Sequence, residues 1–140
     1  MTMRFDGRVA VVTGAGGGLG REHALALAAR GAKVVVNDLG AAVDGSGGGA
    51  SAAALAVVEQ IRAAGGQAIA SGASVTDPAA VQVMVDAAMQ AWGRVDILVN
   101  NAGILRDKSF SKMELTDFRQ VVEVHLMGAV NCCKAVWDVM

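Results

Sequence analysis

Short apolar runs rich in β-branched residues alternate along this chain with longer segments of helical periodicity, and this alternation constrains the fold most. Three of the runs are apolar nearly throughout, as expected of strands that a parallel sheet buries on both faces. The predicted strands are residues 8–14, 32–38, 66–71 and 94–103. The predicted helices are residues 18–30, 51–64 and 77–92, with a last one from about residue 116 to the end.

This alternation predicts an α/β fold: an incomplete, doubly wound parallel sheet of the Rossmann type, with about four strands and with helices on both faces. Sequential right-handed winding gives the strand order 3-2-1-4 and leaves the fourth strand as an exposed apolar edge. Asp77 and Pro78 mark the start of the third helix, since aspartate caps free N–H groups and proline fits the first helical position. The glycine-rich residues 40–51 are predicted to form a mobile loop.

The last helical segment carries one histidine in an apolar environment. A period of 3.6 residues predicts a core-facing stripe of Phe118, Val122, Leu126, Ala129, Cys133 and Trp137. His125 borders this stripe, and two interpretations stay open: a satisfied, partly buried side chain, or a residue that takes part in a reaction. Other apolar residues of the segment fall outside the stripe and favour association with another surface: Val124, Met127, Val130 and Val136.

Composition excludes several classes of function. The net charge of −1 provides no electrostatic footprint for nucleic acid or an anionic membrane, so neither is expected as a partner. No apolar run approaches the length of a membrane span, and the charged opening has no signal-peptide core. The adjacent Cys132 and Cys133 suit no disulfide framework, and the two distant histidines offer no metal-ligand spacing. We therefore expect a cytoplasmic protein without a metal.

The sequence TGAGGGLG directly follows the first predicted strand and opens the first helix. Gly14, Gly18 and Gly20 permit a tight turn, and they let backbone N–H groups approach a pyrophosphate at the positive end of the helix. The strict G-x-G-x-x-G fingerprint is absent, so a plain tight loop is the alternative interpretation.

Asp38 ends the second predicted strand, where a carboxylate can accept hydrogen bonds from both ribose hydroxyls of an adenosine. The alternative is an ordinary polar strand terminus. With the glycine turn, Asp38 predicts a dinucleotide site, and it favours NAD(H) over NADP(H). A 2′-phosphate would meet like charge there, and Gly17, Leu39 and Gly40 offer no positive charge to offset it.

Three motifs thus lie at the ends of predicted strands: Thr13-Gly14-x-x-x-Gly18-x-Gly20, Asp38, and the sequence NNAG at 100–103. Together they resemble the short-chain dehydrogenase/reductase family, and the resemblance covers essentially the whole chain. Within the family, the sequences RFDGRV, VVVNDLG and NNAGILRDKSF are most similar to one group. This group is the 3-hydroxyacyl-CoA dehydrogenase part of peroxisomal multifunctional β-oxidation enzymes and their bacterial relatives.

The resemblance implies which residues contact NAD. Leu19 would lie beside the nicotinamide end, and Asp38 would hold the adenosine ribose. The other implied contacts are Ser74 and Val75 for the adenine, and Asn101, Ala102 and Gly103 for the central part of the cofactor. Many members have an aspartate at the position of Ser74, so a different contact with the adenine amino group is expected here.

The resemblance also implies an activity: NAD-dependent hydride transfer between the cofactor and a secondary alcohol or ketone, with 3-hydroxyacyl-CoA as the expected substrate. In the family, a tyrosine assisted by a lysine supplies acid–base catalysis, and a serine holds the substrate oxygen. This sequence contains no tyrosine. Residues 1–140 are therefore expected to form the cofactor-binding part of one domain whose carboxyl-terminal catalytic part is absent. The alternative is a non-catalytic nucleotide-binding fragment or regulatory module.

Three further expectations follow from the resemblance. His125 stands where the family commonly has an asparagine that supports a water relay behind the catalytic lysine, and an imidazole could serve that purpose. Arg106 and Lys108 could meet the phosphates of coenzyme A, or they could form a solvated basic loop. The last helix corresponds to a subunit interface, so we expect a homo-oligomer or association with the carboxyl-terminal half.

Overall fold

The computed structural model describes residues 2–39 and 50–140. At its centre lies a parallel sheet in the order β3-β2-β1-β4, which confirms the predicted winding. The strands are β1 (Val9–Val12), β2 (Lys33–Asn37), β3 (Ala68–Ser71) and β4 (Ile97–Val99). Val12 pairs with Val36 on one side and with Val99 on the other. Since these strands end at nearly the same level, the loops that follow them meet at one edge of the sheet.

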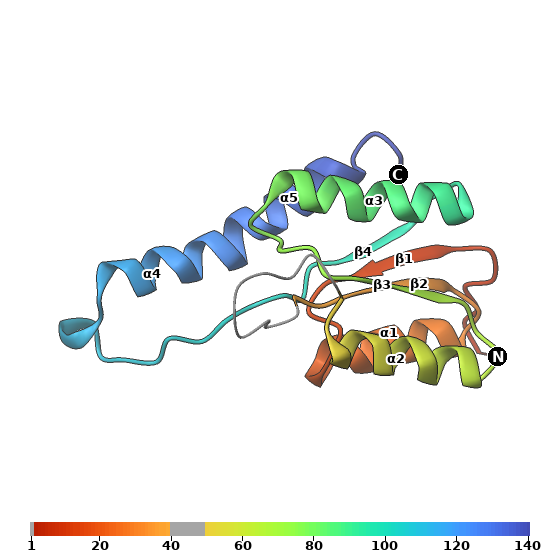
Figure 1. The fold of residues 1–140 in the computed structure, drawn as a ribbon, viewed down its shortest axis with the longest axis horizontal. Helices are drawn as coiled ribbons and strands as arrows, with labels where there is room; N and C mark the ends of the chain where they lie inside the picture. The colour runs from red at the N-terminus through yellow and green to blue at the C-terminus, as the bar shows by residue number, and fades with distance from the viewer. Residues whose placement is uncertain (1, 40–49) are drawn as a thin grey trace.

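Helices cover both faces of the sheet (Figure 1). One face carries α1 (Gly18–Ala29) and α2 (Ala52–Ala63), and the other carries α3 (Pro78–Trp92) and α5 (Gly128–Val136). The predicted start of α3 is confirmed, because Asp77 Oδ1 accepts hydrogen bonds from the N–H groups of Ala79 and Ala80. The Rossmann-type, doubly wound fold is confirmed as well. Residues 40–49, most of the predicted mobile loop, lie outside the described residues.

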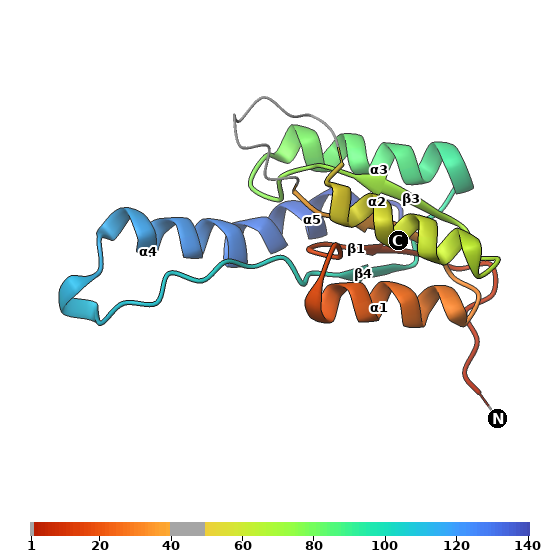
Figure 2. The same ribbon diagram turned by 60° about the horizontal axis from the view of Figure 1, so that its bottom comes forward.

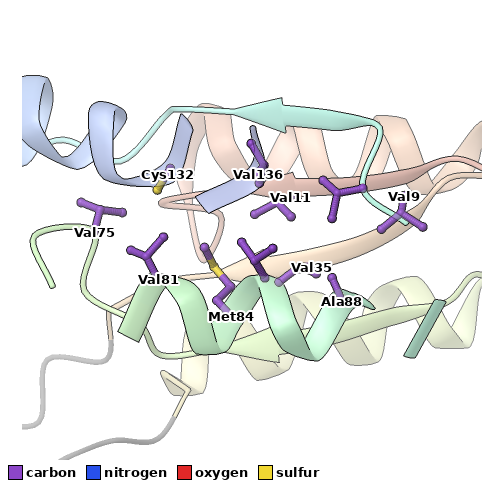
Figure 3. Packing of buried hydrophobic residues seen from close by; sticks show 11 residues of the cluster. Val9, Val11, Val35, Val75, Val81, Met84, Ala88, Cys132 and Val136 are labelled. Atoms are coloured by element: carbon purple, nitrogen blue, oxygen red, sulfur yellow. The ribbon is translucent and has the colours of Figure 1, made fainter. Parts of the chain in front are cut away.

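Valines of β1 and β2 alternate between two buried clusters, one on each face of the sheet. Toward α3 and α5 lie Val9, Val11 and Val35, packed with Met84, Cys132 and Val136 (Figure 3). Toward α1 and α2 lie Val12, Val34 and Val36, packed with Ala24, Val57 and Ile61. The strands are buried on both faces, which explains why their sequences are apolar nearly throughout.

The last helical segment differs from the prediction. It begins at α4 (Leu115–Val122), passes through a π-helical turn, η2 (Glu123–Met127), and continues as α5 to Val136. Much of the stripe predicted to face the core is exposed: Phe118 is 50%, Leu126 58% and Trp137 74% accessible. The residues that pack into the core instead are Val124, Gly128, Cys132 and Val136.

Two local features account for this difference. A π-helical turn contains more residues than an α-helical turn, so it changes which side chains point toward the sheet. Gly128 then lets the segment approach the loop after β3, because a Cβ at this position would lie 2.6 Å from Val75 Cγ2. The face that contains Gly128 is therefore the one that packs against the core.

Residues 104–122, which we call the arm, extend away from the sheet (Figure 1). Figure 2 shows the segment that leaves β4 running beside α4. Asp117 joins the two parts of the arm: its Oδ1 lies 3.7 Å from Arg106 Nε and its Oδ2 lies 3.7 Å from Lys108 Nζ. Among the described residues, no helix has the length and apolar character needed to cross a membrane.

Candidate functional site

The three predicted motifs meet at the carboxyl edge of the sheet, where Thr13, Asp38 and Asn101 follow β1, β2 and β4. Thr13 is 1% exposed, and its Oγ1 accepts hydrogen bonds from the N–H groups of Asn101 (3.1 Å) and Ala102 (3.0 Å). Asn101 Nδ2 donates in return to the carbonyl oxygens of Thr13 and Gly14, each at 3.1 Å. These reciprocal bonds fix the glycine turn against the NNAG sequence.

Two glycines allow this close packing. Gly14 has φ +62°, a left-handed conformation that other residues rarely adopt. A Cβ at Gly20 would collide with the carbonyl oxygen of Gly14 and with Asn101 Nδ2. Gly14 and Gly20 thus serve the structure of the turn, and Asn101, predicted to line the cofactor, uses its amide nitrogen within the protein.

The outer side of the glycine turn is open. A Cβ at Gly17 or Gly18 would meet no heavy atom within 4 Å, and Leu19 is 73% exposed. Gly17 is the N-cap of α1 and supplies no side-chain hydrogen bond to the helix. The first N–H groups of α1 therefore point toward open space at the positive end of the helix dipole. This arrangement suits the pyrophosphate of a dinucleotide.

Asp38 lies directly beside this turn. Its Oδ2 accepts a hydrogen bond from Gly16 N–H at 2.9 Å, and Ser51 Oγ lies 3.4 Å from its Oδ1. A Cβ at Gly16 would lie 2.6 Å from Asp38 Oδ2, so only glycine leaves room for this carboxylate. Sequence reasoning missed both Gly16 and Ser51. Ser51 carried a signal as the serine that directly precedes a helix, and Gly16 carried none that separates it from the neighbouring glycines.

The residues predicted to flank adenine follow β3. Ser74 Oγ and Thr76 Oγ1 share a hydrogen bond of 2.8 Å, and both line an open hollow of about 430 Å³ with Leu39 and Ile104. Val75 is 8% exposed, and its side chain belongs to the core. Only the backbone of Val75 is therefore left to face a nucleotide.

Asn37 is a further residue that sequence reasoning missed. It is 1% exposed, and its Nδ2 donates to the carbonyl oxygen of Ala73 at 2.9 Å and to Ser71 Oγ at 3.2 Å. These bonds hold the loop after β3 beside the end of β2. The available signal was an asparagine at the end of an apolar strand, because a polar side chain that is buried there needs hydrogen-bond partners.

His125 lies on the π-helical turn and contacts the NNAG sequence. Its Nε2 is 3.0 Å from the nitrogen and 2.9 Å from the oxygen of Ile104, so it accepts from the N–H or donates to the carbonyl, depending on the tautomer. A Cβ at Gly103 would lie 2.5 Å from the imidazole Cε1. Of the two open interpretations, a partly buried side chain is wrong, because His125 is exposed. A part in a reaction stays a prediction, and His125 lies beside Gly103 and Ile104, at the end of the NNAG sequence.

Other candidate groups lie outside this site. Arg106 and Lys108 project from the arm toward Asp117. Burial, followed by the neighbouring Cys133, raises the pKa of the Cys132 thiol to about 11. Across residues 2–39 and 50–140, no group of three or more histidine, cysteine or acidic side chains could hold a metal ion. A cavity of about 480 Å³ lies between the carboxyl ends of α1 and α2, away from the three motifs.

Comparison with known proteins gives matches along nearly the whole chain. The family described as short chain dehydrogenase matches residues 8–140. Peroxisomal multifunctional enzyme type 2 of Drosophila melanogaster is 56% identical over 99% of this chain, which covers 22% of that protein. Peroxisomal hydratase-dehydrogenase-epimerase of Saccharomyces cerevisiae is 51% identical over 99% of this chain, which covers 15% of that protein. The chain thus spans a quarter or less of the length of these two relatives.

Solved structures share the fold. A short chain dehydrogenase from Mycobacterium avium has a TM-score of 0.88 and 46% identity, with 96% of this chain and 46% of that chain covered. A second from Burkholderia cenocepacia, in complex with NADP, has a TM-score of 0.86 and 36% identity, and covers 99% of this chain and 53% of its own. A third from Burkholderia phymatum, in complex with NAD, has a TM-score of 0.85 and 34% identity, and covers 99% and 46% respectively.

Proposed function

This chain belongs to the short-chain dehydrogenase family, as its sequence motifs predict, and we propose that it forms the cofactor-binding part of an NAD-dependent oxidoreductase domain. The family binds NAD or NADP. In the proposed reaction, hydride passes between the cofactor and a secondary alcohol or ketone, with a 3-hydroxyacyl-CoA as the substrate. The name of the similar Saccharomyces cerevisiae protein, peroxisomal hydratase-dehydrogenase-epimerase, supports this substrate class, since it describes a dehydrogenase together with a hydratase.

The observation that carries the proposal is the placement of Asp38 beside the open glycine turn. The first N–H groups of α1 would bind the pyrophosphate, and the carboxylate of Asp38 would accept hydrogen bonds from the ribose hydroxyls. A 2′-phosphate would bring negative charge next to Asp38, where part of the surrounding water is excluded. The site therefore favours NAD, although the similar structures contain either cofactor.

A nicotinamide cofactor supplies the hydride, and residues of this chain bind and orient the cofactor. Thr13 and Asn101 hold the turn that faces the pyrophosphate, and His125 fixes the backbone of Ile104 at the other side of the site. An acid–base group is also needed, and the sequence contains no tyrosine. The chain by itself is therefore expected to bind NADH without turning over substrate.

Two measurements on the purified chain test this proposal. Titration with NADH and NADPH, followed by nucleotide fluorescence, should give tighter binding of NADH, and Asp38→Ala should narrow the difference. With NADH and excess acetoacetyl-CoA, the absorbance of NADH should remain constant. Equal affinity for the two cofactors would contradict the NAD assignment. Turnover that survives repurification and disappears in Asp38→Ala would contradict the expected lack of catalysis.

The absence of tyrosine also favours a second candidate function, a nucleotide-binding module that regulates without catalysis. The two candidates differ in the activity of a protein that contains the whole domain: the oxidoreductase oxidises 3-hydroxyacyl-CoA with NAD, and the regulatory module binds NAD only.

The proposed partners are an acyl-CoA substrate and a second copy or a further part of the domain, which would cover the exposed side chains of the last helix. The similar enzymes are named as peroxisomal and give no support to the predicted cytoplasmic location, so imaging of the tagged protein is the appropriate test.

A further inference from the structure

Both carboxylate oxygens of Asp38 have a donor within the protein. Gly16 N–H holds Oδ2 at 2.9 Å, and the hydroxyl of Ser51 reaches Oδ1 at 3.4 Å. The first bond is of ordinary length, and the second is long and therefore weaker. Each oxygen keeps a further lone pair, so Asp38 can accept from a ribose hydroxyl while these donors restrict its rotation.

Ser51 reaches Asp38 because of the way the chain returns to the sheet. Leu39 and Ala50 form an antiparallel bridge, which brings the start of α2 beside the end of β2. Ser51 is also the N-cap of α2, since its Oγ accepts from Ala54 N–H at 3.0 Å. The first turn of α2 packs on the glycine turn, where a Cβ at Gly16 would lie 3.0 Å from the Ala53 Cβ. A single hydroxyl thus accepts from α2 and donates to Asp38.

We propose that Ser51 is a positioning residue for cofactor selection, which it performs by fixing the Asp38 carboxylate toward the adenosine ribose. The inference rests on the proposed function, because it assumes that Asp38 contacts the ribose. With donors on both Oδ1 and Oδ2, rotation of the carboxylate away from a 2′-phosphate is restricted, so the repulsion between the two negative charges is larger. Without the Ser51 hydroxyl, only Gly16 N–H holds the carboxylate, which can then turn aside to admit the phosphate.

The test measures binding of NADH and NADPH by nucleotide fluorescence and expresses the preference as the ratio of the two dissociation constants. Ser51→Ala should lower the preference for NADH on the order of fivefold, as expected for the loss of one long and therefore weak hydrogen bond. Ser51→Thr keeps the hydroxyl and should retain the wild-type ratio. Ser51→Gly lacks the hydroxyl but is a tolerated N-cap, so it should lower the ratio with little loss of stability.

Two controls separate this role from helix capping. Asp77→Ala removes the cap of α3, on the sheet face opposite α2, and should lower the melting temperature without changing the ratio, because the two cofactors carry the same adenine. In an Asp38→Ala background, Ser51→Ala should leave the ratio unchanged, because its effect passes through the carboxylate.

Three results would overturn the inference: a Ser51→Gly ratio within twofold of wild type, an equal change in Asp77→Ala, or a Ser51 effect that persists without Asp38. Failure of the proposed function has a different signature, since the wild-type protein would then show no preference for NADH.

Discussion

The glycine turn and the arm both leave the carboxyl edge of the sheet, and they differ in how their side chains are held. In the turn, Thr13 and Asn101 bond to backbone atoms of each other's segments at about the same short distances, 3.0 to 3.1 Å. In the arm, Asp117 meets its two cations at 3.7 Å, and Phe110 is 83% exposed. The turn is held by partly buried side chain-to-backbone hydrogen bonds. The arm has an exposed hydrogen bond from Arg106 to Gln120 Oε1 at 3.2 Å, two long ion pairs and uncovered apolar side chains.

The two regions therefore depend on different interactions. The turn needs only residues that lie close to it in the described fold, so its geometry is determined locally. The apolar side chains of the arm and of the helix that follows need a covering surface, because exposed apolar area gains nothing from the hydrophobic effect. We therefore expect substitutions in the turn to affect folding, and substitutions on the exposed helix face to affect association.

The largest effect is expected for Gly20→Ala. Its Cβ would collide with the Gly14 carbonyl and with Asn101 Nδ2, and neither group can move without breaking the bonds that hold the turn. The free energy of unfolding, measured by urea denaturation, should fall by about 3 kcal/mol or more.

Gly17→Ala is the matched control, because a Cβ there meets no heavy atom within 4 Å and the backbone is extended at φ −162°. Its stability should remain within about 0.5 kcal/mol of wild type. NADH affinity should still fall, since the methyl group would occupy space proposed for the pyrophosphate. Similar stability of the two variants would show that the turn is not determined by local packing.

Two carboxylates, Asp96 beside the start of β1 and Asp117 in the arm, differ in the same way. Asp96 is mostly buried, accepts from Val9 N–H at 2.9 Å and binds Arg94 and Arg8. Hydrogen bonds from Arg94, and then from Val9 and Arg8, outweigh partial burial and hold the pKa of Asp96 well below its usual range. Asp96→Asn should cost about 2 kcal/mol at neutral pH, whereas Asp117→Asn in the arm should cost less than about 0.5 kcal/mol.

The pH dependence follows from the direction of the Asp96 shift. Because the folded state lowers this pKa, the stabilisation is complete above the pKa of the unfolded chain, about 4, and declines as the pH falls below it. The stability difference between wild type and Asp96→Asn should therefore be constant from pH 8 to about pH 5 and shrink below about pH 4. A difference that grows on acidification would contradict this assignment, and so would an equal cost at Asp117.

The same contrast explains which parts of the fold and of the site can be predicted from the sequence. The strand order and the position of Asp38 follow from local patterns, because apolar strands and their polar ends are consecutive in sequence. The core face of the last helix does not follow from a 3.6-residue period, since the π-helical turn at Glu123–Met127 interrupts that period. Gly16 and Ser51 were missed because their role depends on segments that only the fold brings to Asp38.

His125 holds the start of the arm beside the NNAG sequence, and its replacement gives a prediction of intermediate size. Its contact with Ile104 uses the distal nitrogen, Nε2, which is as many bonds from Cβ as the amide nitrogen of glutamine. His125→Gln should therefore retain the contact. His125→Asn and His125→Ala should lose about 1 kcal/mol of stability together with part of the NADH affinity, measured by urea denaturation and by fluorescence titration. If His125→Asn keeps the stability and the NADH affinity and His125→Gln loses them, the contact of Nε2 with Ile104 does not account for the role of His125.

The smallest effect on stability is expected on the exposed face of the last helical segment. Trp137 is 74% accessible, so replacing it with serine removes little buried apolar area. The free energy of unfolding of Trp137→Ser should stay within about 0.5 kcal/mol of wild type at low protein concentration. If this face binds a second copy, the same substitution should weaken self-association, measured by sedimentation over a range of concentrations.

Val136→Ser is the matched control from the opposite face, where the side chain is 2% exposed. It should cost about 2 kcal/mol or more at every concentration, because it places a hydroxyl in the core beside Met84 and Cys132. A loss of similar size for Trp137→Ser in the monomer would mean that the exposed face is already packed within the chain, and the contrast between the turn and the arm would then fail.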